Sequence, residues 1–214
     1  GTLTNTGTLS TTQTGAGSVN HLINANIINT GVIDIDATAT INATTFDTSA
    51  GSIDVASGST LNLNSTTTTI GTSSSLTGAG TINLIGTQAL NFASPYTISA
   101  TSTLLDPTGT ITFGGPGPLT IAPGGSFKMT QDTANVDIDN QGNLNIEGGT
   151  STINNSINST SFTNSGVLTI RGTSGANVHL IVANGFTNAG TITLDNAHSA
   201  GRSQTLTVSS GTLT

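Results

Sequence analysis

Short stretches of alternating aliphatic and polar residues recur along the chain, and this recurrence predicts its architecture. Residues 164–170 read Asn-Ser-Gly-Val-Leu-Thr-Ile, and residues 188–194 read Asn-Ala-Gly-Thr-Ile-Thr-Leu. The glycines of the two phrases, Gly166 and Gly190, are 24 residues apart, and Gly142 precedes Gly166 by the same interval. A period in the twenties is typical of solenoids, in which each repeat forms one coil.

Further copies of the phrase align on glycines along the whole chain. These are Gly7, Gly31, Gly51, Gly80, Gly109, Gly142, Gly166, Gly190 and, in part, Gly211. The second residue after each glycine is aliphatic in every copy: Leu9, Ile33, Ile53, Ile82, Ile111, Leu144, Leu168, Ile192 and Leu213. The residue after it is always polar, as in a strand with one buried face. We therefore expect the glycine-led strands to stack in one column.

The repeat predicts an all-β chain, a parallel β-helix of about nine or ten coils with ~20–24 residues per coil. A β-sandwich is the competing all-β fold, but it gives no reason for one phrase to recur at 24 residues. We expect residues 1–214 to form a single solenoid segment of a longer repetitive protein. The spacing is irregular between 51 and 142, which indicates insertions or merged coils. The five prolines lie between 95 and 123, so we expect an irregular coil or loop around 93–125.

The amino-acid composition argues against several classes of function. Charged residues make up 6% of the 214 residues, three of them basic, and the formal net charge is −7. This balance argues against binding to nucleic acid or to an anionic membrane. Aromatic residues make up 3%, so base-stacking platforms are scarce. There is no cysteine and no long apolar run, so we expect no thiolate chemistry and no membrane insertion by this segment.

Asparagine recurs two residues before the repeat glycine, and this position predicts a structural role. The residues are Asn5, Asn29, Asn140, Asn164 and Asn188. In stacked coils their amides would form a ladder at a corner, bonding to one another and to the turn backbone. Five residues after the glycine stand Glu147, Arg171 and Asp195, which would stack into an acid–base–acid ladder on the surface.

Asp34 and Asp54 share one outward position and are the strongest candidates for chemistry. Two adjacent carboxylates can contribute to a Ca²⁺ site or act as an acid–base pair in glycoside cleavage, or they can be two solvated acids. Asp137 and Asp139 are interpreted as a solvated strand face. Tyr96 is the one tyrosine and the first residue to test if glycan binding is found.

Other motifs give no reactive centre. His21, His179 and His198 have no partner at metal-ligand spacing, and no hydrolase elbow, P-loop or dinucleotide fingerprint occurs. An array of threonines as in ice-binding solenoids is also considered, but the Thr-rich stretches 38–40, 66–69 and 110–112 look scattered. We expect no enzyme activity, catalytic residue, cofactor or metal site, and the sequence leaves the ligand-binding residues unknown.

The phrase Phe-Thr-Asn-Ser-Gly-Val-Leu-Thr-Ile at 162–170 and its relative Asp-Asn-Gln-Gly-Asn-Leu-Asn-Ile-Glu-Gly-Gly-Thr at 139–150 resemble rungs of bacterial β-helical passengers of the autotransporter and filamentous-haemagglutinin-like adhesin type. The resemblance implies a right-handed helix and an extracellular place at the bacterial cell surface, attached to the outer membrane through parts not in this chain. It also implies cell adhesion and virulence. Partners would be host-cell or surface glycans or proteins and neighbouring repeats of the parent chain. The alternative function is a polysaccharide-binding or polysaccharide-cleaving β-helix.

Overall fold

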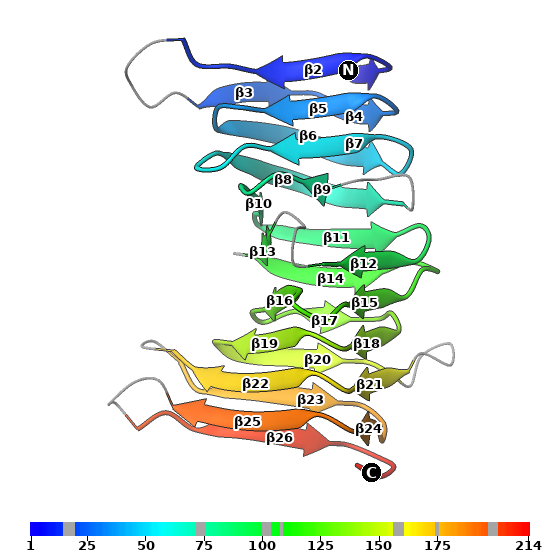
Figure 1. Cartoon of the computed structure of the whole chain (residues 1–214), viewed down its shortest axis with the longest axis vertical. Coiled ribbons are helices and arrows are strands. Elements are labelled where there is room, and N and C mark those ends of the chain that lie inside the picture. Colours follow the sequence, from blue (N-terminus) through cyan, green and yellow to red (C-terminus); the bar gives the residue numbers. More distant parts are fainter. Residues whose placement is uncertain are drawn as a thin grey trace.

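The computed structural model describes residues 1–14, 20–71, 76–99, 109–155, 161–173, 176–196 and 201–214, and the backbone of 104–107. Within these residues the regular structure is all β, without a helix, and every pairing between named strands is parallel. The strands stack along one axis into a parallel β-helix, with the N-terminus at one end and the C-terminus at the other (Figure 1). The predicted all-β fold, a parallel β-helix, is therefore confirmed.

One sheet runs the whole length of the molecule, and each successive coil adds a strand to it. Its main path is β1 (Thr2–Asn5), β4 (Asn26–Asn29), β6 (Ala39–Thr48), β8 (Thr60–Ile70), β11 (Thr87–Phe92), β14 (Thr110–Gly114), β17 (Thr133–Ala134), β20 (Gly149–Ile153), β23 (Val178–Val182) and β26 (Gln204–Val208). We call this the long sheet. The strands β3 (His21–Asn24), β10 (Thr81–Leu84) and β13 (Leu104–Pro107) join it beside this path.

Three shorter sheets complete the coils. The first contains β2 (Thr8–Thr11), β5 (Val32–Ile35), β7 (Ser52–Val55) and β9 (Leu76–Thr77). The second contains β12 (Tyr96–Ile98), β15 (Leu119–Ile121), β18 (Ile138–Asn140), β21 (Phe162–Asn164) and β24 (Thr187–Asn188). The third contains β16 (Ser126–Met129), β19 (Asn143–Glu147), β22 (Val167–Gly172) and β25 (Thr191–Asn196).

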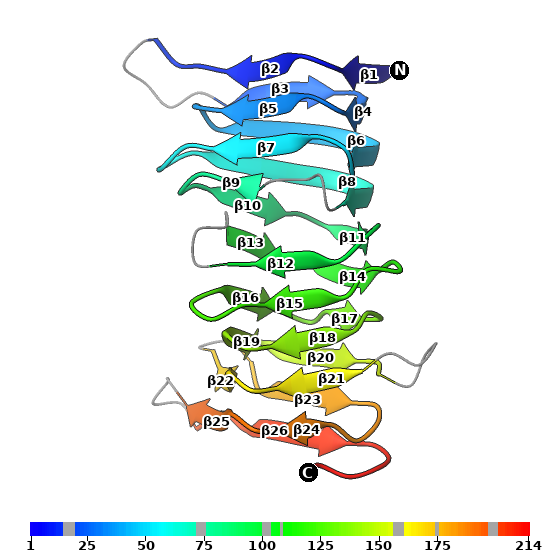
Figure 2. The same cartoon turned by 45° about the vertical axis from the view of Figure 1, so that its right-hand side comes forward.

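The helix is right-handed. In Figure 1 the near strands β2, β5 and β7 point to the left, and β6 and β8 behind them point to the right as the chain descends. In Figure 2, where the right-hand side is turned forward, β12, β15, β18, β21 and β24 cross from right to left at the front. Seen from the N-terminal end, the chain in both views turns clockwise as it moves away along the axis, which is a right-handed path. This handedness agrees with the general rule for parallel crossovers.

The repeat glycines do not form one column, and this corrects the sequence-based alignment. Gly7, Gly31 and Gly51 lead into the first short sheet, whereas Gly142, Gly166 and Gly190 lead into the third. Gly80 and Gly109 lead into β10 and β14 of the long sheet. The phrase therefore encodes a corner followed by a strand, and different corners of the coil use it. The irregular glycine spacing between 51 and 142 arises from this change of corner.

The segment around 93–125 is more regular than we expected. Its strands β12, β14 and β15 pair in register with neighbouring coils, for example Tyr96 opposite Leu119 and Ile98 opposite Ile121. The prolines are accommodated at the strand ends and turns: Pro95, Pro107, Pro116, Pro118 and Pro123. At these positions a missing backbone N–H removes no bond from the middle of a ladder.

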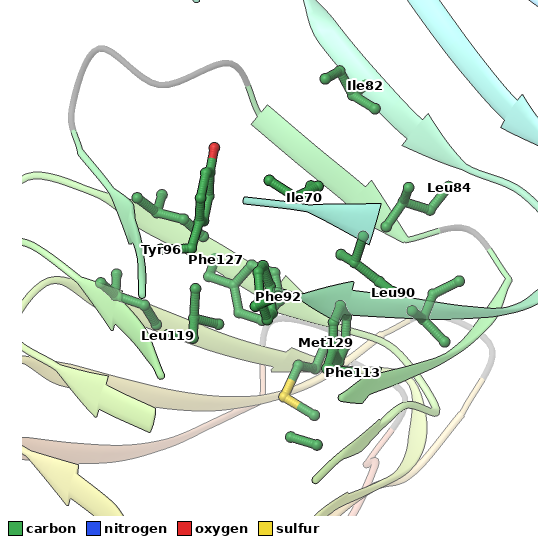
Figure 3. Packing of buried hydrophobic residues seen from close by; sticks show 14 of the residues in the cluster. Ile70, Ile82, Leu84, Leu90, Phe92, Tyr96, Phe113, Leu119, Phe127 and Met129 are labelled. Carbon is green, nitrogen blue, oxygen red and sulfur yellow. The ribbon is translucent and has the colours of Figure 1, made fainter. Parts of the chain in front are cut away.

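The core is a continuous stack of inward-facing aliphatic residues, as in Ile33, Ile53 and Leu144, which are at most 1% exposed. Near the middle of the stack, aromatic side chains also belong to this core. Phe92 stacks on Tyr96 with ring centroids 5.6 Å apart, and Phe113 meets Phe127 edge-on at 5.1 Å (Figure 3). Because one coil cannot bury its own apolar face, each depends on the coils above and below it.

Two corners require glycine because successive coils touch there. A Cβ atom on Gly31 would lie 2.1 Å from the carbonyl oxygen of Gly7, and one on Gly166 would lie 2.2 Å from that of Gly142. Any side chain at these positions would push the coils apart. The recurrence of glycine in the repeat is thus explained by backbone contact along the stack.

Candidate functional site

The predicted asparagine ladder is confirmed, but it is divided into two. Asn5 donates to Asn29 over 2.8 Å at one corner, and Asn140 donates to Asn164, which donates to Asn188, over 2.6 Å each at another. Each of the three donors also bonds a backbone carbonyl of the next coil. These amides face the interior, so they hold coils together and do not present a ligand surface.

The second ladder begins at Asn140, which is fully buried. The residue opposite it in the preceding coil is Ile121, which has no hydrogen-bonding group on its side chain. The Asn140 Oδ1 atom consequently has no hydrogen-bond partner among the described residues. We interpret this atom as the unsatisfied end of the ladder, an energetic cost of starting a polar stack within an apolar core.

Asp34 and Asp54 stand opposite each other in adjacent coils, on β5 and β7, as their shared position in the repeat predicts. Both side chains are partly exposed on the outer face. Desolvation raises the pKa of the Asp34 carboxyl, and the nearby charges of Asp36 and Asp54 raise it further. The Thr77 hydroxyl donates to Asp54. The predicted pairing of Asp34 with Asp54 is therefore confirmed. Among the described residues, however, no group of three acids or histidines is placed to hold a metal ion.

The predicted surface ladder of Glu147, Arg171 and Asp195 also forms in register across β19, β22 and β25. The Arg171 Nε atom lies 2.9 Å from the Asp195 carboxylate. Their side chains are 43% and 36% exposed, so solvent weakens the pair and it contributes mainly to register.

The remaining sequence candidates do not form a site. His21 lies on β3 and His179 on β23, where the His179 imidazole is 2.8 Å from the Thr207 hydroxyl. His198 lies outside the described residues. Tyr96 is only 7% exposed and packs on Phe92, so it cannot serve as an open aromatic platform for a sugar ring. Burial raises its pKa above the ordinary value.

Threonines that look scattered in the sequence are brought into one column on the outer face of the long sheet. The column runs through Thr45, Thr67, Ala89, Thr112, Thr133 and Thr152, each opposite the next. Sequence reasoning missed this column because the intervals between its members vary with coil length. Ala89 interrupts it with a methyl group.

A groove lies at the bend of β6 and β8, with a volume of about 540 Å³. One wall is an outer asparagine ladder, in which Asn64 donates to Asn42 over 3.1 Å and Asn42 donates to Asn24 over 2.9 Å. The remaining lining consists of small or uncharged residues. The groove is wide open to solvent and mostly polar, with Ala25 and Ala43 among its lining residues.

A second, deeper hollow of about 680 Å³ lies farther along the long sheet. Its floor includes Ala89 and Gly114, and Asn91 and Asn135 stand beside them. The turn at 115–117 and the residue Asp137 form its wall. Ala89 and Gly114 occupy two neighbouring outward positions and offer at most a methyl group, so they leave a depression in the outer face of the long sheet. No pattern in the sequence marked this site, because its residues come from three coils.

A buried polar cluster lies inside the long sheet near the same coils. The Asp132 carboxylate is 1% exposed and accepts the backbone N–H groups of Ile111 and Thr130 at 2.7 and 2.6 Å. Burial raises the pKa of Asp132 to about 6, although both hydrogen bonds oppose the shift. Because this carboxylate is sealed from solvent and fixes a turn, we interpret it as structural.

No helix in the described part of the chain is long and apolar enough to cross a membrane. In comparisons of the chain with protein-family models, curated proteins and solved structures, nothing matches.

Proposed function

We propose that this segment is a rigid stalk of a large exported bacterial surface protein and contributes to adhesion. The observation that carries the proposal is the uninterrupted stack, in which the long sheet passes through ten strands from successive coils. At ~4.8 Å per step this makes a rod of roughly 45 Å. Interior amide ladders and an aliphatic core resist bending, and most outward positions are polar, although single apolar side chains such as Leu22 and Leu194 are exposed.

The mechanism would be geometric. Each added coil lengthens the rod and places the next part of the protein farther from the cell. The stack also offers long outer faces for weak repeated contacts. The extracellular, outer-membrane-associated location and the role in virulence are part of this proposal and follow from the resemblance of the repeat phrases at 139–150 and 162–170 to bacterial adhesin passengers. Host-cell or surface glycans or proteins would be the partners, and neighbouring repeats would extend the rod.

The stalk role can be tested with the isolated segment. Small-angle scattering should give an elongated particle of roughly the length stated above, and force spectroscopy should show coils that resist extension. Beads coated with the segment should attach to host-type cells or abiotic surfaces more than beads coated with an unrelated polar protein. A compact or flexible particle would contradict the stalk role, and attachment equal to the control would remove the adhesive part.

The alternative is a β-helix that binds or cleaves polysaccharide. The observation favouring it is the pair Asp34 and Asp54, in which one carboxyl has a raised pKa, as a general acid requires. A reducing-end assay on polysaccharides with the wild type and Asp34→Asn tests this directly. Product formed by the wild type and lost in the variant would replace the stalk as the leading function.

A further inference from the structure

The hollow on the long sheet brings together polar groups that the fold itself does not use. The side chain of Asn91 makes no protein hydrogen bond within the described residues, although its oxygen lies close to Gly114. The Asn135 oxygen accepts the Asn154 amide over 3.2 Å, and the Asn135 NH₂ group makes no hydrogen bond to the residues that the structure describes. Asn91 and Asn135 flank Gly114, one in each neighbouring coil.

Asp137 adds one charge at the edge of this hollow. Among the described residues only its Oδ1 atom takes part in hydrogen bonds, accepting the backbone N–H and the hydroxyl of Ser161 at 2.5 and 3.3 Å. The Oδ2 atom remains available as an acceptor. Thr112 on the floor of the same hollow adds a hydroxyl that makes no protein hydrogen bond in the described part of the chain. The hollow therefore presents amide donors and acceptors, a hydroxyl and a half-used carboxylate to the same space.

The wall of the hollow is held in place by backbone contact. Gly115 has φ of 103°, and a Cβ there would lie 2.3 Å from the Phe92 carbonyl oxygen. A Cβ on Gly117 would lie 2.0 Å from the Ser94 oxygen. The turn is thus pressed against the preceding coil and carries Pro116, whose exposed ring gives the hollow an apolar edge.

We propose that this hollow binds a neutral sugar. Side-chain amides and a carboxylate can each bond two neighbouring hydroxyls of a sugar ring, and an apolar edge suits the C–H face of the ring. The volume of about 680 Å³ lies within the range of small-molecule sites. The proposal deepens the adhesive role proposed above and rests on it, since it assigns glycan contact to one place on the stalk.

Other ligands fit the hollow less well. An acidic glycan or phosphate would meet the Asp137 carboxylate without a basic residue in the lining, on a protein of net charge −7. Ca²⁺ takes six to eight oxygen ligands and usually several carboxylates, and this lining supplies one carboxylate. The hydroxyl groups of a neutral sugar can bond the two amides, the Thr112 hydroxyl and the Asp137 Oδ2 atom, so this ligand uses all of the uncommitted groups named above.

The test is an array of neutral and sialylated oligosaccharides probed with the 214-residue segment, followed by calorimetric titration with the free neutral sugar of the strongest signal. Ala89→Leu fills the floor of the hollow and removes no hydrogen bond. Thr152→Leu is its matched control, since it places the same side chain in the same outward column away from the hollow. Asn91→Ala removes one uncommitted amide.

We expect the wild type and Thr152→Leu to bind neutral glycans equally, with and without EDTA. Ala89→Leu should lose binding, and Asn91→Ala should weaken it about tenfold, the effect of roughly one hydrogen bond. Three results would overturn the proposal: no neutral glycan binds, Ala89→Leu binds as well as the wild type, or EDTA abolishes binding. If the scattering still shows a rod in that case, the stalk function stands and only the sugar site is wrong.

Discussion

Replacing Asn164 by alanine tests the idea that interior amides, and not only apolar burial, hold the coils together. Asn164 is 1% exposed, and its side chain takes part in three hydrogen bonds. Its Nδ2 donates to Asn188 over 2.6 Å and to the Thr191 carbonyl over 3.3 Å, and its Oδ1 accepts from Asn140 over 2.6 Å. The substitution removes all three and interrupts the second ladder in its middle.

The expected cost follows from these bonds. At about 1 kcal/mol net for each, the variant should lose about 3 kcal/mol of the free energy of unfolding. Part of the cost falls on the fully buried Asn140 amide, which keeps its 3.0 Å bond to the Val167 carbonyl. Asn188 is partly exposed and can be solvated again, which limits the loss on its side.

Urea unfolding followed by circular dichroism measures this cost. Asn145→Ala is the control, because Asn145 points outward from β19 with one exposed hydrogen bond to Ser126, and it should stay within about 0.5 kcal/mol of the wild type. Hydrogen exchange at the Gly190 amide, which bonds the Asn164 carbonyl, would show whether loosening is local to these coils. Equal small losses in both variants would refute a stabilising role for the ladder.

Three further predictions follow from the core, the buried acid and the surface pair. Ile170→Asp should unfold the neighbouring coils, because Ile170 is fully buried and an unpaired charge there is very costly; native circular dichroism and an unchanged melting temperature would contradict the strand register. Asp132, with a folded pKa of about 6 against 3.8 unfolded, should add about 3 kcal/mol of stability below pH 4 that is lost as the pH rises through 6. In Asp132→Asn the urea midpoint should change less with pH between 4 and 6 than it does in the wild type. An equal change in both proteins would mean that other groups cause the pH dependence. Arg171→Ala should lower the free energy of unfolding by less than about 1 kcal/mol, because the pair with Asp195 is well exposed, and the loss should be smaller still at high salt. A larger loss in chemical denaturation that does not change with salt would contradict this prediction.

Local pattern alone determined much of this architecture. Alternation of aliphatic and polar residues, as in Leu168, Thr169 and Ile170, requires a strand with one buried face, and a glycine before it permits close stacking at a corner. Repetition at 24 residues then requires equivalent coils to lie on one another. For the same reason the sequence predicted the Asn140–Asn164–Asn188 ladder, since residues at one repeat interval must meet.

Only the tertiary structure decided which corner each phrase occupies. Gly31 and Gly166 carry the same local signal, yet they lead into different sheets, because any corner of a coil can be made by the same turn and strand. Coil length varies in this chain: the paired residues Ile27 and Phe46 are separated by fewer positions than Gly149 and Val178. A fixed period therefore loses register after a few coils.

The candidate sites show the same division. Asp34 and Asp54 could be paired from the sequence because they follow successive repeat glycines. Ala89, Gly114 and Asp137 share no repeat position, and they border one hollow only because stacking fixes the register of three coils. The local sequence thus determined the structure of each coil. Which outward residues become neighbours depended on how coils of unequal length align along the stack, and only the tertiary structure shows this.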